Sequence, residues 1–187
     1  MDNYDTPDYI AQKMAKLAYG RCCEPAAGLG AIANHLPSFT TCIEIDPERF
    51  ERGRLSSPHS IYWHLFDFLD REKCNSRFDT IITNPPFSQL LPYIRRGLEV
   101  VNEGGQLVYL MPLSWMGAQG RAAEWQAMDA HISRVLVIPG RVDYLTDGVP
   151  MSQQVRAKDG KKMGGRRETD AVFIIKPGAG PKFHDYI

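Results

Sequence analysis

Asn84 and Phe87 have the clearest chemical potential in this chain, because a side-chain amide and an aromatic face are separated only by Pro85 and Pro86. The four residues follow an apolar, β-branched run over residues 80–83 that is typical of a strand. Each proline fixes its φ angle and lacks an N–H donor, so neither a sheet nor a helix interior can continue there. The residue before each proline is extended as well. We therefore predict that the amide and the ring meet one planar ligand at the mouth of a sheet.

The run Asn84-Pro85-Pro86-Phe87 resembles motif IV of the amino-methyltransferases that use S-adenosylmethionine, above all the adenine-N6 DNA methyltransferases. The resemblance implies that the Asn84 side-chain oxygen and the Pro85 carbonyl accept the hydrogens of the adenine amine, while Phe87 stacks on the base. That amine is a poor nucleophile, so positioning and preorganised acceptors must supply the acceleration. The base must also be flipped out or single-stranded. Taken alone, the four residues leave open a proline-rich turn with an asparagine cap.

A glycine-containing loop lies between the strand-like residues 21–23 and a helix predicted over residues 31–36. Glycines allow positive φ and close backbone approach, and a helix start offers free N–H groups to a polar ligand. The loop lacks the third glycine of the dinucleotide fingerprint, and it resembles motif I of class I methyltransferases. The resemblance implies that the cofactor is bound by Glu24, Pro25, Ala26, Gly28 and Gly30.

The strand predicted over residues 39–45 carries Glu44 near its end, about 20 residues beyond the glycines. An acid in this place accepts the ribose hydroxyls in nucleotide-binding α/β folds, so we predict that Glu44 and the adjoining Ile45 contact the cofactor. Asp46, which precedes the next helix, is predicted to be its N-cap.

A third strand, predicted over residues 60–65, leads to Asp67 and Phe68. This pair resembles motif III of the same family. The resemblance implies that Asp67 accepts the amino group of the cofactor's adenine and that Phe68 packs against the ring. A solvated strand-end acid beside core aromatics is the alternative.

The N-terminal residues Tyr4 and Thr6 precede an amphipathic run with apolar residues from Ile10 to Ala18. Thr6 is predicted to be the N-cap of a helix and Pro7 its first residue. The segment resembles motif X, whose loop closes over the methionine end of the cofactor, which implies that Tyr4 and Thr6 bind it. A capped surface helix is the alternative.

The remaining pattern predicts helices over residues 89–101, ended by Gly104-Gly105, and over 118–130, with strands over 106–112, 134–138 and 171–175. The predicted fold is α/β: a Rossmann-like, doubly wound sheet of about seven strands flanked by helices. The family resemblance implies that the last strand is antiparallel. Ligands of such sheets bind at the carboxyl ends of the strands.

The chain has 187 residues, 43% of them apolar, which fits one domain over residues 1–187. Its 22 basic and 22 acidic residues balance, so bulk charge neither indicates nor excludes a nucleic-acid partner. No signal peptide or apolar run of roughly 20 residues is visible, which predicts a cytoplasmic protein without membrane contact. The cysteines form no C-x-x-C pair, which predicts buried thiols in a reducing compartment rather than a metal site: Cys22, Cys23, Cys42 and Cys74.

Residues 145–169 are predicted to form a basic, mobile loop. Its cations could bind phosphates, although a solvated loop is the common interpretation of such a run: Arg156, Lys158, Lys161, Lys162, Arg166 and Arg167. Tyr144, just before the loop, loosely resembles motif VIII, which implies a second stacking face for the target base. A packed loop tyrosine is the alternative.

The resemblance covers residues 4 to about 176 and implies methyl transfer from S-adenosylmethionine to the N6 amine of adenine in DNA. No separate target-recognition domain is visible, which predicts relaxed or short sequence specificity, or a partner subunit. An RNA adenine methyltransferase or a protein glutamine methyltransferase are the alternatives, and Phe87 favours a base because the glutamine enzymes typically have Tyr there. A catalytically silent subunit that binds cofactor and nucleic acid would not need the Asn84–Phe87 loop.

Overall fold

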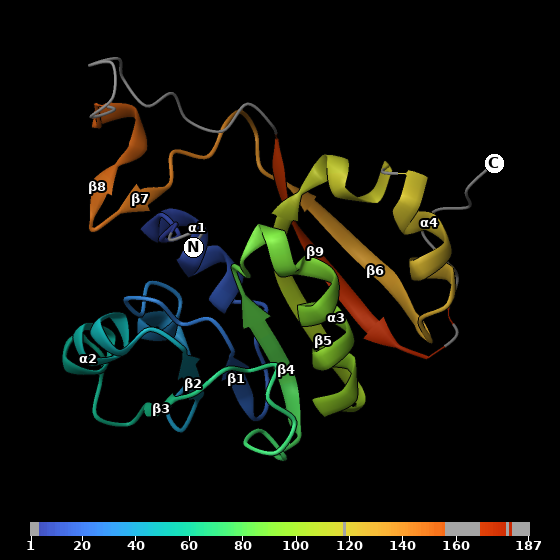
Figure 1. The fold of residues 1–187 in the computed structure, drawn as a ribbon, viewed down its shortest axis with the longest axis horizontal. Coiled ribbons are helices and arrows are strands. Elements are labelled where there is room, and N and C mark those ends of the chain that lie inside the picture. The colour runs from blue at the N-terminus through green and yellow to red at the C-terminus, as the bar shows by residue number, and fades with distance from the viewer. Residues whose placement is uncertain (1–3, 118, 156–168, 179, 181–187) are drawn as a thin grey trace.

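A seven-stranded sheet forms the centre of the computed structural model, which describes residues 4–117, 119–155, 169–178 and 180 (Figure 1). The spatial order of its strands is β3-β2-β1-β4-β5-β9-β6. In chain order the strands are β1 (Cys22–Glu24), β2 (Thr41–Glu44), β3 (Tyr62–Leu65), β4 (Phe78–Thr83), β5 (Val101–Pro112), β6 (Ala130–Val137) and β9 (Asp170–Pro177).

The first five strands pair in parallel. The last strand, β9, lies antiparallel between β5 and β6, so both the α/β fold and the antiparallel last strand are confirmed. The chain moves outward from β1 through β2 to β3 and then returns to β4 on the other side of β1. The carboxyl ends of β1 and β4 therefore flank the switch point of the sheet, where ligands of open α/β sheets bind.

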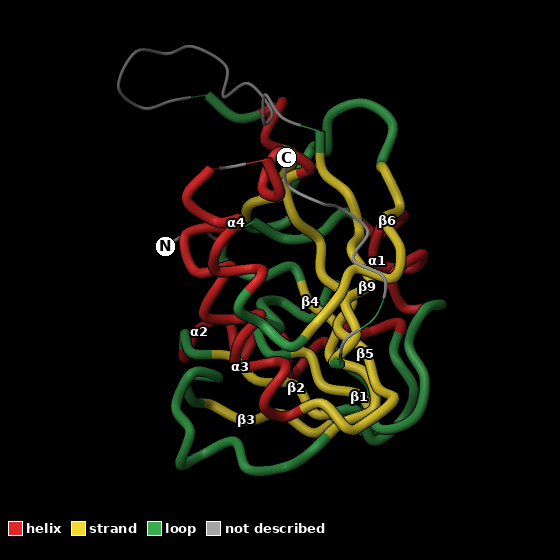
Figure 2. Tube along the Cα trace, turned by 90° about the vertical axis from the view of Figure 1, so that its right-hand side faces the viewer, coloured by secondary structure: helices red, strands yellow, loops and turns green. Residues whose placement is uncertain are grey.

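Helices cover both faces of the sheet. Figure 2 shows α1 and α3 on opposite sides of it. The helices are α1 (Asp8–Ala15), α2 (Pro47–Ser56), α3 (Leu90–Val100) and α4 (Gln119–Gln126), with 3₁₀ turns η1 (Ala33–His35), η2 (Phe87–Gln89), η3 (Leu113–Gly117) and η4 (Met151–Gln153). None of the helices in the described ranges has the length and apolar character that a bilayer crossing requires.

Two apolar clusters fill the space between the sheet and its helices. Ile81 of β4 packs on the α3 side with Ile94, whereas its neighbour Ile82 packs on the α1 side with Met14. Successive strand residues point to opposite faces, so a strand buried on both faces is apolar throughout. All four cysteines are buried free thiols, as predicted.

The helix predicted over residues 31–36 is reduced to the single 3₁₀ turn η1. Leu36 has extended dihedrals (φ −85°, ψ 159°) because it precedes Pro37, which disfavours helical geometry in the residue before it. The predicted start of α1 was also wrong by one residue. Pro7 occupies the N-cap position without a side-chain hydrogen bond, and Thr6 lies outside the helix.

Two predicted boundaries in the second half of the chain were also wrong. The helix ends at Val100, and β5 begins at Val101, which pairs with Phe78 before a register shift. Gly104, at φ 75°, therefore lies in the irregular part of β5 and does not terminate the helix. Likewise, β6 begins at Ala130, inside the segment predicted as helix.

Part of the predicted mobile loop forms a hairpin. Strands β7 (Leu145–Thr146) and β8 (Val149–Pro150) pair antiparallel, and Asp147 and Gly148 between them have φ values of 52° and 78°. Positive φ at both central residues is the type I′ turn of tight hairpins. The six cations from Arg156 to Arg167 lie outside the described residues.

Candidate cofactor and substrate site

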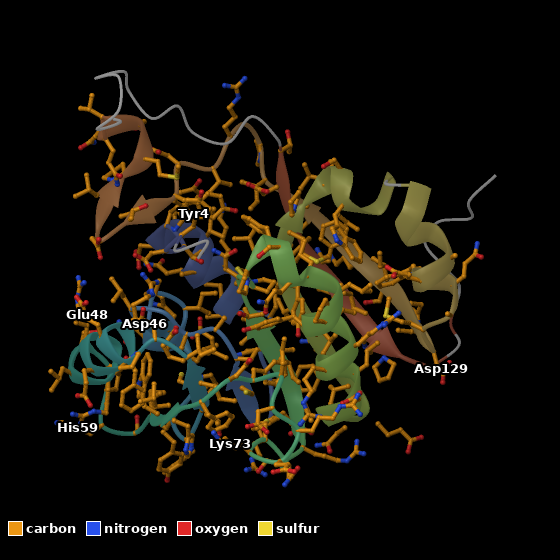
Figure 3. The ribbon with its side chains drawn as sticks, in the orientation of Figure 1. Tyr4, Asp46, Glu48, His59, Lys73 and Asp129 are labelled. Carbon is orange, nitrogen blue, oxygen red and sulfur yellow. The ribbon has the colours of Figure 1, made fainter. Side chains whose placement is uncertain are left out.

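A pocket opens at the carboxyl ends of the central strands. It is lined by residues of every loop that was predicted to bind the cofactor, namely Tyr4, Pro25, Ala26, Gly28, Glu44, Ile45, Asp67, Phe68 and Asn84, together with Pro86. Figure 3 shows Tyr4 beside the β7–β8 hairpin and Lys73 at the opposite edge of the sheet. Five separate loops thus converge on one cavity, as the strand order requires.

Glu44 is held rigidly in the pocket wall. One of its carboxylate oxygens, Oε2, accepts a hydrogen bond from the Gly28 backbone N–H at 2.7 Å. The other, Oε1, accepts from the backbone N–H groups of Ile45 and Asp46, each at 2.8 Å. Each carboxylate oxygen has two acceptor positions, so Oε2 retains one for a ligand hydroxyl. The side chain links the ends of β1 and β2 and presents its charge in a fixed orientation.

Asp46 has a different role from Glu44. Its Oδ1 accepts hydrogen bonds from the Glu48 and Arg49 backbone N–H groups at 2.9 and 3.1 Å, which confirms the predicted N-cap of α2. This cap fixes the first turn of α2, where Arg49 begins its course toward the pocket.

Asp67 and Phe68 follow β3 at the pocket edge. Oδ1 of Asp67 accepts from the Leu69 backbone N–H at 2.9 Å, which leaves Oδ2 as an acceptor. The Phe68 side chain is only 1% exposed, and its ring centroid lies 5.5 Å from that of Tyr93. Phe68 therefore supports the wall from the core, while Ile45 presents apolar surface at 48% exposure.

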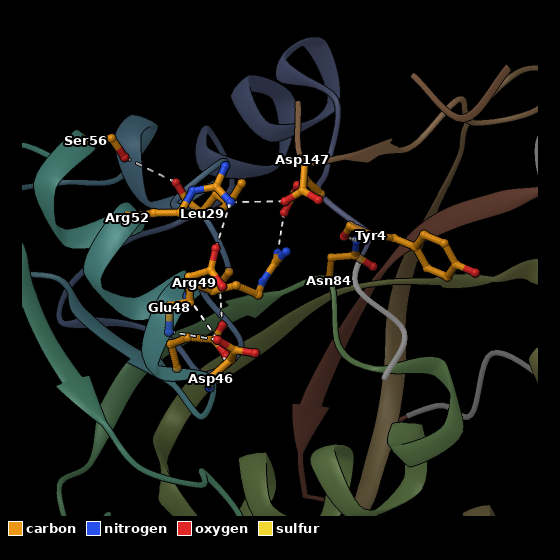
Figure 4. Close-up of polar contacts among 12 residues, drawn as sticks. Tyr4, Leu29, Asp46, Glu48, Arg49, Arg52, Ser56, Asn84 and Asp147 are labelled. Carbon is orange, nitrogen blue, oxygen red and sulfur yellow. Dashed lines mark hydrogen bonds and ion pairs between the residues drawn. The ribbon is translucent and has the colours of Figure 1, made fainter. Parts of the chain in front are cut away.

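Asn84 stands at the end of β4 and contacts the N-terminal segment. Its Nδ2 donates a hydrogen bond to the Tyr4 backbone carbonyl at 3.1 Å, and Figure 4 shows the two residues side by side. Oδ1 of Asn84 is buried without a hydrogen-bond partner in the described part of the chain. The contact with Tyr4 fixes which end of the amide is the acceptor, and the acceptor capacity of Oδ1 is unused in the described part of the chain.

Phe87 and Tyr144 do not form an open base clamp. Their ring centroids are 6.1 Å apart in an edge-on arrangement. Tyr144 is fully buried, and its hydroxyl donates to Asp170 Oδ2 at 3.1 Å. The packed-tyrosine alternative thus describes Tyr144, which contacts Phe87 from the core and also lies near Tyr4, at 6.0 Å between centroids.

Three predicted cofactor residues do not line this pocket: Thr6, Glu24 and Gly30. Thr6 is 5% exposed and Glu24 2%. Burial raises the pKa of Glu24 well above its ordinary value, although a hydrogen bond from the Ala33 backbone acts in the opposite direction. Glu24 therefore lies buried beneath the loop that links β1 to η1 rather than in the pocket. Gly30 has φ 84° and shapes that loop.

Arg49, Asp5 and Phe66 are site residues that the sequence reasoning missed. Arg49 and Phe66 line the pocket, and Arg49 Nη2 donates to Asp5 Oδ1 in a short ion pair. Burial raises the pKa of Asp5 above its ordinary value even though Arg49 acts to lower it. Arg49 could have been predicted, because it lies in the first turn of the helix that follows Glu44. Nothing in the sequence pointed to Asp5 as its partner.

No cluster of three or more metal-binding side chains occurs among the described residues. The charged groups that line the pocket are the acids Glu44 and Asp67 and the cation Arg49, and neutral polar side chains complete the lining: Tyr4, Asn84, Ser88, Gln89 and Tyr93. This set suits an organic ligand with hydroxyl and amino donors and a carboxylate.

Neither a scan against protein-family models nor a search of curated proteins gave a match. Solved structures do match. A proposed RNA methyltransferase from Pyrococcus horikoshii superposes with a TM-score of 0.71 and 16% identity, over 95% of this chain and 88% of that one. A proposed class I S-adenosylmethionine-dependent methyltransferase from Listeria monocytogenes gives 0.67 and 13%, over 97% and 63%.

Trm5 from Methanocaldococcus jannaschii, solved in complex with adenosine, matches with a TM-score of 0.60 and 14% identity, over 96% of this chain and 51% of that one. The chain thus spans about half of Trm5 and just under two thirds of the Listeria protein. At these identities the likeness concerns the fold. The seven-stranded sheet with its antiparallel β9 is the fold of the class I S-adenosylmethionine-dependent methyltransferases.

Proposed function

We propose that this protein transfers a methyl group from S-adenosylmethionine to the exocyclic N6 amine of adenine in DNA, with relaxed or short sequence specificity. The observation that carries the proposal is the buried Oδ1 of Asn84, which has no partner in the described part of the chain. It lies in a loop whose two prolines and aromatic residue resemble motif IV of the amino-methyltransferases, at the wall of a pocket that Glu44 and Gly28 also line.

The pocket residues fit S-adenosylmethionine. Glu44 offers a charged acceptor to the ribose hydroxyls, and Oδ2 of Asp67 offers one to the adenine amino group. Ile45 and Phe66 line the same pocket with apolar surface. Gly28, at φ 57°, lets the loop backbone approach a ligand closely. When bound, the cofactor supplies an electrophilic methyl group.

The protein's part in the reaction is to hold the target amine. In the proposed mechanism Asn84 Oδ1 and the Pro85 carbonyl accept its two hydrogens, which directs the nitrogen lone pair away from the ring plane. Both acceptors are preorganised, because Asn84 Nδ2 is already bound to Tyr4 and Pro86 restricts the preceding Pro85 to extended geometry, which limits the direction of its carbonyl. Phe87 stacks on the base, with Tyr144 supporting the Phe87 ring edge-on.

RNA is the second candidate substrate, and a specific observation favours it. The protein from Pyrococcus horikoshii, at a TM-score of 0.71, is a proposed RNA methyltransferase. Either nucleic acid would be held by the cations at 156–167, by a partner subunit, or by both. These cations lie outside the described residues, so their role follows from sequence and charge alone.

The decisive experiment offers radiolabelled S-adenosylmethionine with duplex DNA, single-stranded DNA, RNA and protein, followed by identification of the modified product. N6-methyladenine in DNA is the expected product. The Asn84→Ala protein is the control, and its turnover should fall by about 100-fold or more with cofactor affinity retained, because an acceptor used mainly in the transition state is removed. Methylated RNA or glutamine would replace the proposed substrate, and near-normal turnover by Asn84→Ala would contradict the mechanism.

A further inference from the structure

Arg49 is the one cationic side chain among the described residues that line the pocket, where the other charged groups are Glu44 and Asp67. It lies in the first turn of α2, and its side chain reaches from the helix toward Asn84 and Tyr4 (Figure 4). The guanidinium therefore lies on the side of the pocket that Asn84 and Tyr4 form.

The course of the Arg49 side chain depends on Gly28. A Cβ atom at Gly28 would lie 2.5 Å from Arg49 Nη2, which is far inside van der Waals contact. A side chain at position 28 would therefore displace the guanidinium from this course, and glycine also permits the positive φ. Position 28 is thus matched to Arg49 as well as to the turn.

Asp5 holds the guanidinium at its far end. The ion pair joins Nη2 to Oδ1, and the two side chains are only 12% and 9% exposed. Asp5 is in turn fixed by two backbone hydrogen bonds with Leu145 of β7, at 2.8 and 3.1 Å. The orientation of Arg49 is thereby set by residues that come from distant parts of the chain.

The ion pair leaves hydrogen-bonding capacity unused. A guanidinium has five N–H donors in a planar fork that matches a carboxylate, and the bond to Asp5 is the one side-chain hydrogen bond of Arg49 in the described part of the chain. A buried ion pair with few hydrogen bonds adds little stability, because desolvation offsets the attraction. Fold stabilisation alone therefore accounts poorly for a nearly buried arginine at a pocket wall.

We propose that Arg49 binds the α-carboxylate in the amino-acid part of S-adenosylmethionine, and that Asp5 acts as a positioning residue for it. This inference rests on the proposed cofactor. The sequence had suggested that Tyr4 and Thr6 bind the methionine end of the cofactor. Tyr4 lines the pocket, whereas Thr6 is 5% exposed and does not. Asp5 leaves at least one edge of the guanidinium to the ligand.

The test compares ligands with and without the amino-acid part. Calorimetry measures binding of S-adenosylmethionine, S-adenosylhomocysteine and 5′-methylthioadenosine, which lacks the carboxylate, to the wild-type protein and to Arg49→Gln. We expect Arg49→Gln to weaken the first two by roughly 10- to 150-fold, the range for a hydrogen bond to a charged group. Binding of 5′-methylthioadenosine should stay within about twofold.

Two further variants guard against misfolding and nonspecific charge effects. The double variant Asp5→Asn/Arg49→Gln leaves no unpaired buried charge and should show the same ligand selectivity. Arg52→Gln is the matched control, because Arg52 lies one turn further along α2, pairs with Glu48 and Asp147, and does not line this pocket. It should bind all three ligands normally.

The outcomes separate the inference from the proposed function. Equal weakening of all three ligands by Arg49→Gln, or no change in any, would overturn the role of Arg49 while leaving the cofactor in place. A wild-type protein that binds neither S-adenosylmethionine nor S-adenosylhomocysteine would instead overturn the proposed function, and with it the assignment of Arg49.

Discussion

Among single residues, Glu44 has the most specific predicted role, because its carboxylate is held by the backbone and is proposed to bind the ribose hydroxyls. Three backbone N–H groups fix it. Glu44→Gln should weaken S-adenosylmethionine binding by about tenfold or more, since hydrogen bonds to a charged group are worth about 1.5–3 kcal/mol. Calorimetry on the folded variant measures the loss.

Asp46→Asn is the matched control for Glu44. Asp46 caps α2 through Glu48 and Arg49, and asparagine is as good an N-cap as aspartate. We expect near-normal cofactor affinity in this variant. A larger loss for Asp46→Asn than for Glu44→Gln would move the ribose site to Asp46.

The buried carboxyl group of Glu24 should make the stability of the fold depend on pH. Burial raises its pKa well above the ordinary value, so the folded protein binds a proton that the unfolded chain releases near the ordinary glutamate pKa. The contribution of Glu24 to stability is therefore fully present below about pH 4.5 and is lost as pH rises through the raised pKa. The slope attributable to Glu24 is at most about 1.4 kcal/mol per pH unit, and it ends above the raised pKa.

Glu24→Gln removes this proton equilibrium while keeping the side-chain shape. Denaturant unfolding between pH 5 and 8 should show the variant gaining on the wild type with each step in pH. Glu48→Gln, at a site whose side chain is 81% exposed, is the control and should follow the wild type. Parallel curves for Glu24→Gln and wild type would mean that Glu24 is ionised in the folded state.

Among the secondary-structure elements, the β7–β8 hairpin contacts both the N-terminal segment and helix α2 beside the pocket. Leu145 pairs with Asp5, and Arg52 of α2 donates to Asp147 at 3.1 Å. Gly148→Ala places a side chain at φ 78° and should cost about 1 kcal/mol of local stability. Hydrogen exchange of the Asp5 and Leu145 amides should accelerate accordingly.

Gly104→Ala is the matched control for the hairpin. Gly104 has a similar φ of 75° and, like Gly148, has nothing within 4 Å of an added Cβ, but it lies in β5. Its replacement should leave the exchange of the Asp5 amide unchanged. Equal acceleration of Asp5 amide exchange in both variants would show that the change reflects a loss of overall stability and not a loss of the hairpin contact.

The elements differ in how far the sequence predicted them. The ends of β4 and β2 were predicted well. In both places β-branched, strand-favouring residues are followed within three positions by a proline, which cannot continue a strand. The hairpin was missed although Asp147-Gly148 is a strong two-residue turn signal, because its strands are only two residues each and too short to show an alternating pattern. The short η1 turn was missed because Pro37 acts on the residue before it.

At the scale of the whole molecule, the unpredicted part of the site consists of contacts between distant residues. The bond from Asn84 to Tyr4 spans 80 positions and the pair of Arg49 with Asp5 spans 44. Local propensity carries no information on such pairs. Strand order brings them together, and only the fold reveals that Arg49 crosses Gly28 or that Tyr144 is buried.

The positive charge of the segment 158–167 should determine how strongly the protein binds nucleic acid. The chain has no net charge, so a local cluster of cations must supply any attraction to phosphates. Glutamine replacements should weaken nucleic-acid binding about equally for all sequences and reduce the salt dependence by ~0.9 for each duplex phosphate that the variant no longer neutralises. The replaced residues are Lys158, Lys161, Lys162, Arg166 and Arg167.

Salt titrations of nucleic-acid affinity for the wild type and this variant decide the matter. The control replaces five exposed cations scattered over the described surface, which gives the same change in net charge: Lys13, Lys16, Arg54, Lys73 and Arg134. Because counterion release depends on the phosphates that are actually neutralised rather than on net charge, the control should keep a steep slope. Cofactor affinity should be unaffected in both variants, since the cations of the control do not line the pocket and the residues proposed to bind the cofactor belong to other loops than the 158–167 segment. Equal slopes for the wild type and the 158–167 variant would mean that this segment is only solvated and that nucleic acid is positioned by other residues or by a partner subunit.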